Sequence, residues 1–394
     1  MSWGSTTLGE AGRWVSGGTP STSNEAFWGG DIPWMSSKSL TMFQVRDSDR
    51  RLTTLGAANG TKLVPVDTIL MVVRGMSLKT EFRMGITQRQ VALSQDLKAL
   101  LPSQSFDPLF LAYSIKARTE DVLDMVDEAG HGTGRLQTDR LFSLRLPVPP
   151  IEEQRAIAAT LGALDDKIES NRRGIGTAGE LLDALADRVS QMLPNTPLGS
   201  LASLAKQSVN PTALDGAQVA HFSLPAFDTD ARPEITSAST IKSNKLQVAD
   251  TSVLVSRLNP RINRTWWAVP VAGLSALSST EFAVLTAGTE VELAGVWLAV
   301  RAPYFRDELP RRVTGTSGSH QRVRPEDLLS VEVPDTRALD NETMATALRL
   351  LRLIHQWRAE SFRLAALRDK LLPELLSGRI RVPEATDLVQ DAVV

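Results

Sequence analysis

Three stretches of the chain concentrate basic side chains in a way that suits binding to a phosphate-rich polymer. Between Thr251 and Thr280 the chain carries three arginines and no acidic residue, and the stretch between Asp67 and Asp96 is also predominantly basic. A third acid-free stretch, from Leu309 to Pro325, contains four arginines and a histidine. Lysine and arginine neutralise phosphates and can also contact guanine edges. The candidate DNA-binding residues are Lys38, Arg74, Lys79, Arg83, Arg89, Arg135, Arg257, Asn259, Arg261, Arg264, His320, Arg322 and Arg324.

A charged stretch can equally be a solvated surface, so each cluster taken alone leaves both interpretations open. The net charge of −2 shows no basic excess over the whole chain, and any binding to nucleic acid must rest on local charge. The aromatic residues Trp28, Trp34, Trp266 and Trp267 are more typical of core packing than of base stacking, and we leave them out of the site.

Most catalytic signatures are absent from the sequence. It has no cysteine, which excludes disulfides, thiolate zinc sites and a cysteine nucleophile. It has no Gly-Lys pair, so it lacks the phosphate-binding loop of ATPases. Pro149-Pro150 is followed by Ile151, not by the aromatic residue found in adenine methyltransferases. We therefore expect no catalytic residue, no metal site and no cofactor in this chain.

One pattern faintly resembles a metal-dependent nuclease. Asp67 stands at the start of a predicted strand, and Asp96-Leu97-Lys98 supplies an acid-x-lysine triplet further on. Such triplets occur by chance in most chains of this length, and the second half of the sequence has Ser278-Ser279-Thr280 at the corresponding place. We interpret Asp67 as a turn residue that precedes a strand.

The elements that must position the basic stretches occur twice. Leu8-Gly9 and Leu198-Gly199 each open an arm, and each arm has an apolar, β-branched run that ends in arginine, at Arg74 and at Arg257. Later in each arm a leucine, a serine and a proline recur with identical spacing, namely Leu141, Ser143 and Pro147 in the first and Leu328, Ser330 and Pro334 in the second. The chain therefore contains two arms of one plan.

Each arm is followed by a long helical pattern with a narrow apolar seam. The first begins after Pro149-Pro150, and three glycines between Gly174 and Gly179 leave open whether it is continuous. A narrow stripe is buried most readily against another helix, although each helix could instead cover its own arm. The predicted seam and partner-docking residues are Leu161, Leu164, Ile168, Leu182, Leu185, Leu350, Ile354, Trp357, Leu364 and Leu371.

Composition agrees with a globular protein of more than one domain. The chain has 394 residues, with 42% hydrophobic and 22% charged side chains, which are values near the averages for soluble domains. The sequence shows no apolar run long enough to span a membrane and no secretory signal at its start, so we expect a cytoplasmic protein.

The motifs, taken in order, resemble the specificity subunits of type I restriction-modification systems. The segment 16–21, Ser-Gly-Gly-Thr-Pro-Ser, and the segment 27–34, Phe-Trp-Gly-Gly-Asp-Ile-Pro-Trp, resemble the opening of a target-recognition domain. The junction from Arg135 into the first helix and the C-terminal segment 367–378 are also similar to that family. The second arm departs from the pattern, since Lys206 to Pro211 replaces the Gly-Gly-Thr-Pro opening.

The resemblance implies an α+β chain of two mixed α/β target-recognition domains, each followed by a long helix, with the two helices paired as an antiparallel coiled coil. The implied boundaries are residues 1–150 and 195–334 for the two domains, 151–194 and 335–382 for the helices, and 383–394 for a flexible tail. The expected partners are double-stranded DNA, two modification subunits and restriction subunits. S-adenosylmethionine, ATP and Mg²⁺ are expected on those partners.

Two other functions remain open at this point. The chain could be a self-contained restriction enzyme or methyltransferase, or a coiled-coil scaffold whose arms bind protein. The sequence does not determine the recognised DNA sequence, its gap length, which arginines contact bases, or whether the system restricts as well as methylates.

Overall fold

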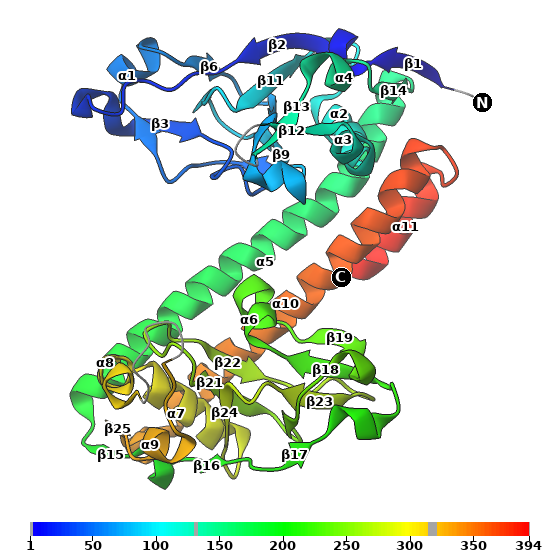
Figure 1. Ribbon diagram of the computed structural model, residues 1–394. Helices are drawn as coiled ribbons and strands as arrows, with labels where there is room; N and C mark the ends of the chain where they lie inside the picture. Colours follow the sequence, from blue (N-terminus) through cyan, green and yellow to red (C-terminus); the bar gives the residue numbers. More distant parts are fainter. Residues whose placement is uncertain (1–2, 130–132, 314–320, 394) are drawn as a thin grey trace. The chain divides into compact units, whose positions relative to one another are not determined.

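The computed structural model describes residues 3–129, 133–313 and 321–393. The chain forms two compact units, one made of Met1–Lys167 with Leu364–Val394 and the other of Ile168–Arg363. We call them unit 1 and unit 2. Each consists of a globular arm and a share of both long helices, and Figure 1 shows the elements of each. The candidate residue His320 lies outside the described residues.

The first arm is a mixed α/β fold, as expected. Its strands form sheets in the orders β1-β14, β5-β3-β10-β6, β2-β11-β7-β9-β4 and β12-β13-β8. The strands are β1 Gly4–Thr7, β2 Gly12–Ser16, β3 Trp28–Met35, β4 Gln44–Val45, β5 Arg51–Leu52, β6 Lys62–Val64, β7 Ile69–Val72, β8 Arg74–Gly75, β9 Met84–Thr87, β10 Val91–Leu93, β11 Leu97–Pro102, β12 Val126–Ala129, β13 Thr133–Leu136 and β14 Arg145–Val148. The helices are α1 Thr54–Ala58, α2 Pro108–Lys116, α3 Thr119–Asp124 and α4 Thr138–Phe142, with a 3₁₀ turn η3 at Met76–Lys79.

The second arm is also mixed α/β. Its sheets have the orders β15-β25, β16-β24-β21-β22 and β17-β20-β23-β18-β19. The strands are β15 Asn195–Pro197, β16 Ser203–Leu204, β17 Ser208–Val209, β18 Gln218–Phe222, β19 Glu234–Ser237, β20 Lys245–Gln247, β21 Ser252–Ser256, β22 Thr265–Ala268, β23 Ser275–Ser278, β24 Phe282–Thr286 and β25 Glu332–Pro334. The helices are α6 Leu224–Asp230, α7 Glu290–Arg301, α8 Pro303–Glu308 and α9 Pro325–Leu329.

The repeat found in the sequence has a structural counterpart at the base of each arm. The backbone N–H of Leu8 donates to the carbonyl of Leu144 over 2.8 Å, and that of Leu198 donates to the carbonyl of Val331 over 2.9 Å. In both arms the opening strand then pairs antiparallel with the last strand, as β1 with β14 and β15 with β25. The two Leu-Gly pairs therefore close their arms in the same way.

The apolar runs that carry the repeat form central strands. All four residues of β7 and all five of β21 are buried. A strand that is covered on both faces is a continuous hydrophobic run without polar alternation. The burial of both strands therefore accounts for the apolar, β-branched runs in the sequence.

The two halves of the 16–34 motif bind each other. The indole N–H of Trp28 donates to the carbonyl of Ser21 over 3.0 Å, and that of Trp34 donates to the carbonyl of Gly18 over 3.1 Å. A side chain at Gly18 would place its Cβ 2.0 Å from the carbonyl oxygen of Gly60, so only glycine fits there. The motif is thus a packing unit, in agreement with the interpretation of its tryptophans.

The first long helix, α5, is continuous from Ile151 to Met192, so the glycines do not break it (Figure 1). A Cβ on Gly174 would lie 2.9 Å from Cζ3 of Trp357 in α10. The glycine therefore allows the indole of the second helix to approach the backbone of the first. This approach offsets the helix propensity that glycine lacks.

The second long helix, α10, covers Asn341–Leu376, which is shorter than the expected segment 335–382. Beyond it, α11 covers Val382–Val393, where a flexible tail was expected, so that expectation was wrong. Within unit 1, Ala385 and Val389 of α11 are buried, and the hydroxyls of Thr160 and Thr386 lie 3.3 Å apart. The segment is amphipathic, and it forms a helix because its apolar face packs against the rest of unit 1.

The predicted seam residues are buried or half-buried. Within unit 2, Asn171 of α5 donates to Glu360 of α10 over 2.6 Å while Gly174 contacts Trp357, so numbers rise along one helix as they fall along the other. Leu182 and Ile354 share one hydrophobic core with strands and helices of the second arm. In unit 2 the two helices therefore pack against each other and also against the second arm. The two predicted packing arrangements occur together.

Candidate nucleic-acid interface

The first arm places two of the candidate arginines directly opposite each other. Arg74 in β8 and Arg135 in β13 are partners in an antiparallel ladder, and both side chains are exposed. Like charges at facing positions of two strands repel, which destabilises the free arm. An anion bound between them would relieve that repulsion.

Two lysines lie on segments that adjoin these strands. Lys79 is exposed at the end of η3, which packs on β13. A Cβ on Gly75 would lie 3.4 Å from Cβ of Ser37, so the exposed Lys38 follows a residue that contacts β8. We call Lys38, Arg74, Lys79 and Arg135 the first-arm basic cluster.

Two candidate DNA-binding residues of this arm, Arg83 and Arg89, form contacts with other parts of the arm. Arg83 is half-buried and forms an ion pair with Glu81 over 2.8 Å, while one N–H of its guanidinium donates to the carbonyl of Ser37 over 3.4 Å. Arg83 therefore supports the loop before Lys38. Arg89 donates to the carbonyl of Asp31 in β3 over 3.4 Å, so it contacts a different strand from the cluster.

One acid adjoins the basic cluster. The carbonyl of Asp96 accepts from the backbone N–H groups of Val73 and Arg74, over 2.9 and 3.3 Å. Burial raises the pKa of the Asp96 carboxyl, and the charge of Arg74 acts in the opposite direction. The backbone of Asp96 thus supports β8, while its carboxyl lies near Arg74.

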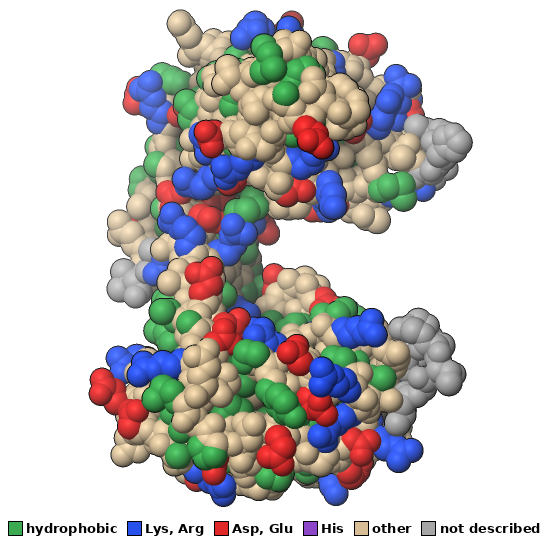
Figure 2. Space-filling view, turned by 90° about the vertical axis from the view of Figure 1, so that its left-hand side faces the viewer, with side chains coloured by type: hydrophobic (Ala, Val, Ile, Leu, Met, Phe, Trp, Pro, Cys, Tyr) green, Lys and Arg blue, Asp and Glu red, His purple; other side chains and the backbone are tan. Residues whose placement is uncertain are grey.

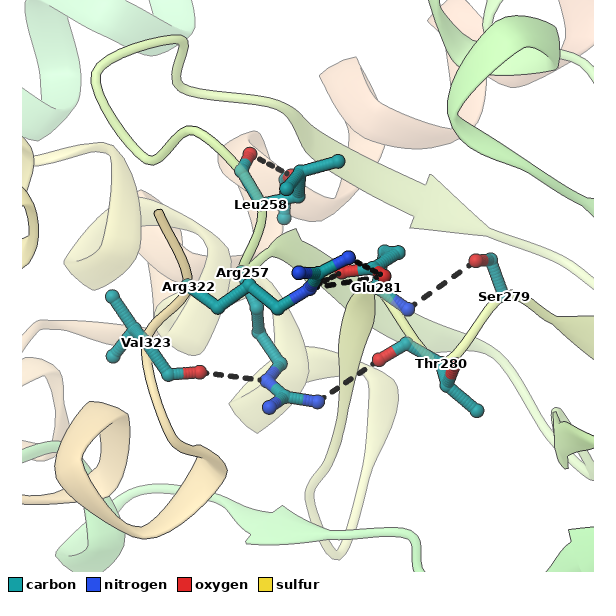
Figure 3. A network of polar contacts seen from close by, with 8 residues as sticks. Arg257, Leu258, Ser279, Thr280, Glu281, Arg322 and Val323 are labelled. Carbon is teal, nitrogen blue, oxygen red and sulfur yellow. Dashed lines mark hydrogen bonds and ion pairs between the residues drawn. The ribbon is translucent and has the colours of Figure 1, made fainter. Parts of the chain in front are cut away.

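In the second arm, Arg257 is used to hold the arm together (Figure 3). Its Nε donates to the carbonyl of Val323 over 2.8 Å, and its Nη1 donates to the carbonyl of Thr280 over 2.9 Å. Burial lowers the pKa of Arg257, although the charge of Glu281 opposes this effect. The guanidinium joins two chain segments that are distant in sequence.

Arg322 forms a bidentate ion pair with Glu281, with hydrogen bonds of 2.8 to 3.1 Å (Figure 3). Arg264 is likewise paired with Asp228, over 2.6 and 2.9 Å. The stretches that carry Arg264 and Arg322 are acid-free in sequence, but the fold brings an acid from another segment to each of these two arginines. Asp228 and Glu281 are far in sequence from the arginines they contact, so the local sequence pattern did not reveal them.

The turn between β21 and β22 leaves one predicted cation exposed. Asn259 has a positive φ of 48°, and its backbone N–H donates to the carbonyl of Gln321 over 3.0 Å. Arg261 and its neighbour Ile262 are exposed at the turn, and Arg324 is exposed before α9. Asparagine tolerates the left-handed conformation better than most residues, which suits a tight turn.

The backbone reveals which residues of the two arms correspond. The N–H of Leu136 donates to the carbonyl of Val73, and the N–H of Val323 donates to the carbonyl of Arg257, so Val73 and Arg257 are equivalent. The alignment of Arg74 with Arg257 was therefore wrong by one residue. By the same rule Arg135 corresponds to Arg322, each six residues before the shared leucine.

The acids correspond as well. Asp96 accepts a backbone hydrogen bond from Val73, and Glu281 accepts one from Arg257, over 2.9 and 2.8 Å. Each arm thus has an acid at this structural place, and it lies near Arg74 in the first arm and pairs with Arg322 in the second. Sequence reasoning missed both acids. The constant spacing from Arg135 and Arg322 to the leucine was the signal that could have aligned the two arms correctly.

The nuclease-like residues do not meet. Lys98 faces Met71 across the ladder of β11 with β7, whereas Asp67 precedes the other end of β7. Four residues of extended chain separate the two positions, or about 13 Å. Asp67 has a positive φ of 62°, as expected of a turn residue, and the described residues contain no cluster of metal ligands.

Charge over the surface is mixed. Figure 2 shows Lys and Arg side chains interspersed with Asp and Glu on the face of each unit that it presents. No helix among the described residues is long and apolar enough to cross a membrane. Any attraction of DNA must therefore come from local groups such as the first-arm basic cluster.

Comparisons with known proteins agree with the motifs. Residues 2–176 match the family described as the type I restriction modification DNA specificity domain. The chain is 33% identical over 177 residues to the EcoR124I/EcoR124II specificity subunit of Escherichia coli, with 44% of each protein covered. It is 26% identical over 188 residues to the MjaIX specificity subunit of Methanocaldococcus jannaschii, with 47% of this chain and 42% of the relative covered. The matched stretch thus spans less than half of each curated relative.

The fold is shared over a longer stretch. The structure is similar to the S subunit of a type I restriction-modification system from M. genitalium, with a TM-score of 0.59 and 15% identity. This likeness covers 95% of this chain and 96% of that chain. At such low identity it concerns the arrangement of elements alone.

Proposed function

We propose that this chain, whose residues 2–176 match the type I restriction modification DNA specificity domain, is a specificity protein that reads a split, asymmetric DNA site with its two arms. The observation that supports two readers is that equivalent backbone hydrogen bonds place Asp96 and Arg135 of the first arm where Glu281 and Arg322 stand in the second. Side chains at that place differ between the arms, which suits two different half-sites.

We further propose that α5 and α10 pair as an antiparallel coiled coil that sets the gap between the half-sites. The proposed readers are residues 1–150 and 195–334, and the paired helices are α5, Ile151–Met192, and α10, Asn341–Leu376. Two modification subunits dock on this chain and methylate adenine with S-adenosylmethionine. Restriction subunits supply ATP- and Mg²⁺-dependent cleavage. The chain itself is non-catalytic and acts in the cytoplasm.

Arm exchange tests the division of labour. Replacing residues 1–150 with the equivalent arm of a relative changes one half of the methylated sequence and preserves the other half and the gap. Methylation mapping in cells that carry the system gives both results at once. If both halves change together, the arms are not independent readers.

Salt-dependent binding tests the first-arm basic cluster. Arg74→Ala and Arg135→Ala in the assembled complex each weaken binding to all DNA sequences alike and reduce the log-log salt slope by about one, as for a lost phosphate contact. Arg118, which pairs with Asp121 in α3 over 3.0 Å, provides the control substitution Arg118→Ala. Equal effects of all three substitutions would contradict the assignment.

A further inference from the structure

A cavity of about 200 Å³ lies inside unit 2, where β22 and α7 face the two long helices. Two indole rings, of Trp267 and Trp297, form part of its wall, and both residues are less than a tenth exposed. The cavity is distant in sequence from every candidate DNA-binding residue of the first arm. Ile354 of the helix seam also lines the cavity, but the function proposed above gives the enclosed space itself no role.

One wall of the cavity is α5 at Gly179. A Cβ built there meets no atom within 4 Å, so a larger side chain would fit. Glycine in a helix interior costs about 1 kcal/mol relative to alanine, and unfilled space forfeits packing contacts. Gly174 is explained by the indole of Trp357, but no such contact explains Gly179.

The opposite wall contributes a cation. Arg358 of α10 lines the cavity, and its guanidinium makes no hydrogen bond and no ion pair within 4 Å in the described part of the chain. Burial lowers the pKa of Arg358, and the charge of Asp230 opposes this without a direct contact. A desolvated cation without an acceptor is unfavourable.

The remaining charges of the cavity are balanced. Asp183 accepts three hydrogen bonds from Arg301, over 2.6 to 2.9 Å. His355 also lines the cavity, and burial, with the charge of Arg358, lowers its pKa, which favours the neutral imidazole near pH 7. One positive charge, that of Arg358, therefore lacks a contacting counter-charge.

We propose that this cavity binds a small aromatic carboxylate. A carboxylate supplies the acceptor that Arg358 lacks, and its single charge matches the single uncompensated cation. A flat ring suits the two indoles, and the volume admits a ligand of about ten non-hydrogen atoms, below the usual range for drug-sized ligands. The ligand offsets both unfavourable features, the empty space at Gly179 and the unpaired guanidinium.

Calorimetric titration of the full chain with benzoate tests the proposal, with benzamide as a neutral ligand of the same shape. Benzoate binds saturably at one site per chain, and benzamide binds at least about tenfold more weakly, the effect expected from losing a charge-assisted hydrogen bond. Arg358→Gln weakens benzoate binding by a similar factor, whereas Arg358→Lys retains most of it. The assay needs neither DNA nor partner subunits.

Filling the cavity provides an independent arm of the test. Gly179→Leu abolishes benzoate binding, while Gly176→Leu, on the same helix but at an exposed glycine, preserves it. Melting curves of both variants confirm that each is folded. Absence of saturable benzoate binding, equal affinity for benzamide, or unchanged binding in Arg358→Gln or Gly179→Leu would each overturn the proposal.

Discussion

Removal of one hydroxyl group, that of Tyr113, tests how the first arm is attached to the long helices inside unit 1. Tyr113 in α2 is fully buried, and its hydroxyl donates to one carboxylate oxygen of Asp165 in α5 over 2.6 Å. Arg368 of α10 donates to the other oxygen of the same carboxylate over 2.5 Å. Tyr113→Phe removes one of these hydrogen bonds and leaves the aromatic packing unchanged.

The expected magnitude follows from burial and charge. A hydrogen bond to a charged group contributes about 1.5–3 kcal/mol net, so Tyr113→Phe lowers the free energy of opening of α2 by roughly 2 kcal/mol. Arg368→Met costs more, about 3–5 kcal/mol, because it leaves the buried carboxylate without its cation. Burial, reinforced by the charge of Asp165, raises the pKa of Tyr113, so the phenol remains the donor throughout the neutral range.

Native-state hydrogen exchange of the α2 amides measures this opening without assuming that the whole chain unfolds in one step. Tyr304, the second of the two tyrosines, is 47% exposed in α8 and provides the control substitution Tyr304→Phe. A loss below about 0.5 kcal/mol in Tyr113→Phe, the range of ordinary surface substitutions, would refute the reasoning.

Three further sets of substitutions test other parts of the fold. Gly174→Ala lowers the melting temperature because its Cβ meets an indole ring at 2.9 Å, whereas Gly176→Ala, with open space around it, stabilises by about 1 kcal/mol. Burial and the charge of a nearby lysine lower the pKa of His221 from 6.5, so the unfolded chain binds the proton more readily and stability falls below about pH 6.5. His221→Gln lessens that fall in denaturation curves between pH 7 and pH 5, and an unchanged curve would contradict the assignment. Leu161→Asp with Leu164→Asp places charge at two fully buried positions, so both melting temperature and co-purification with modification subunits decrease; unaltered values of both would show that the seam is not used.

Sequence patterns predicted the parts of the fold that depend on local chemistry. The buried runs at β7 and β21, the Leu-Gly openings and the narrow apolar seams of the long helices each follow from residue type and spacing within one segment. The register of the repeat at Leu141 and Leu328 also came from spacing alone. These features need no knowledge of which distant segments meet.

The site was less predictable because the availability of an arginine to bind an anion depends on the acids that the fold brings next to it. Glu281 is 41 residues from Arg322, and Asp228 is 36 residues from Arg264, yet each pair forms a bidentate contact. An acid-free window in the sequence is therefore not an acid-free surface. The C-terminal helix α11 was missed for a related reason, since its apolar face becomes stable only against the surface that it covers in unit 1.

The two arms differ in what their shared place offers an anion. In the first arm, Arg74 and Arg135 repel each other at facing positions, so a phosphate there would gain attraction and relieve repulsion together. In the second arm, a phosphate at Arg322 would compete with Glu281, whose carboxylate is in contact with the same guanidinium. Since that pair is partly exposed and such pairs contribute only about 0–1 kcal/mol, competition would reduce phosphate affinity without preventing contact. The carboxylate would at the same time hold the planar guanidinium in one orientation, which favours directional contacts to a base edge over contacts to a phosphate.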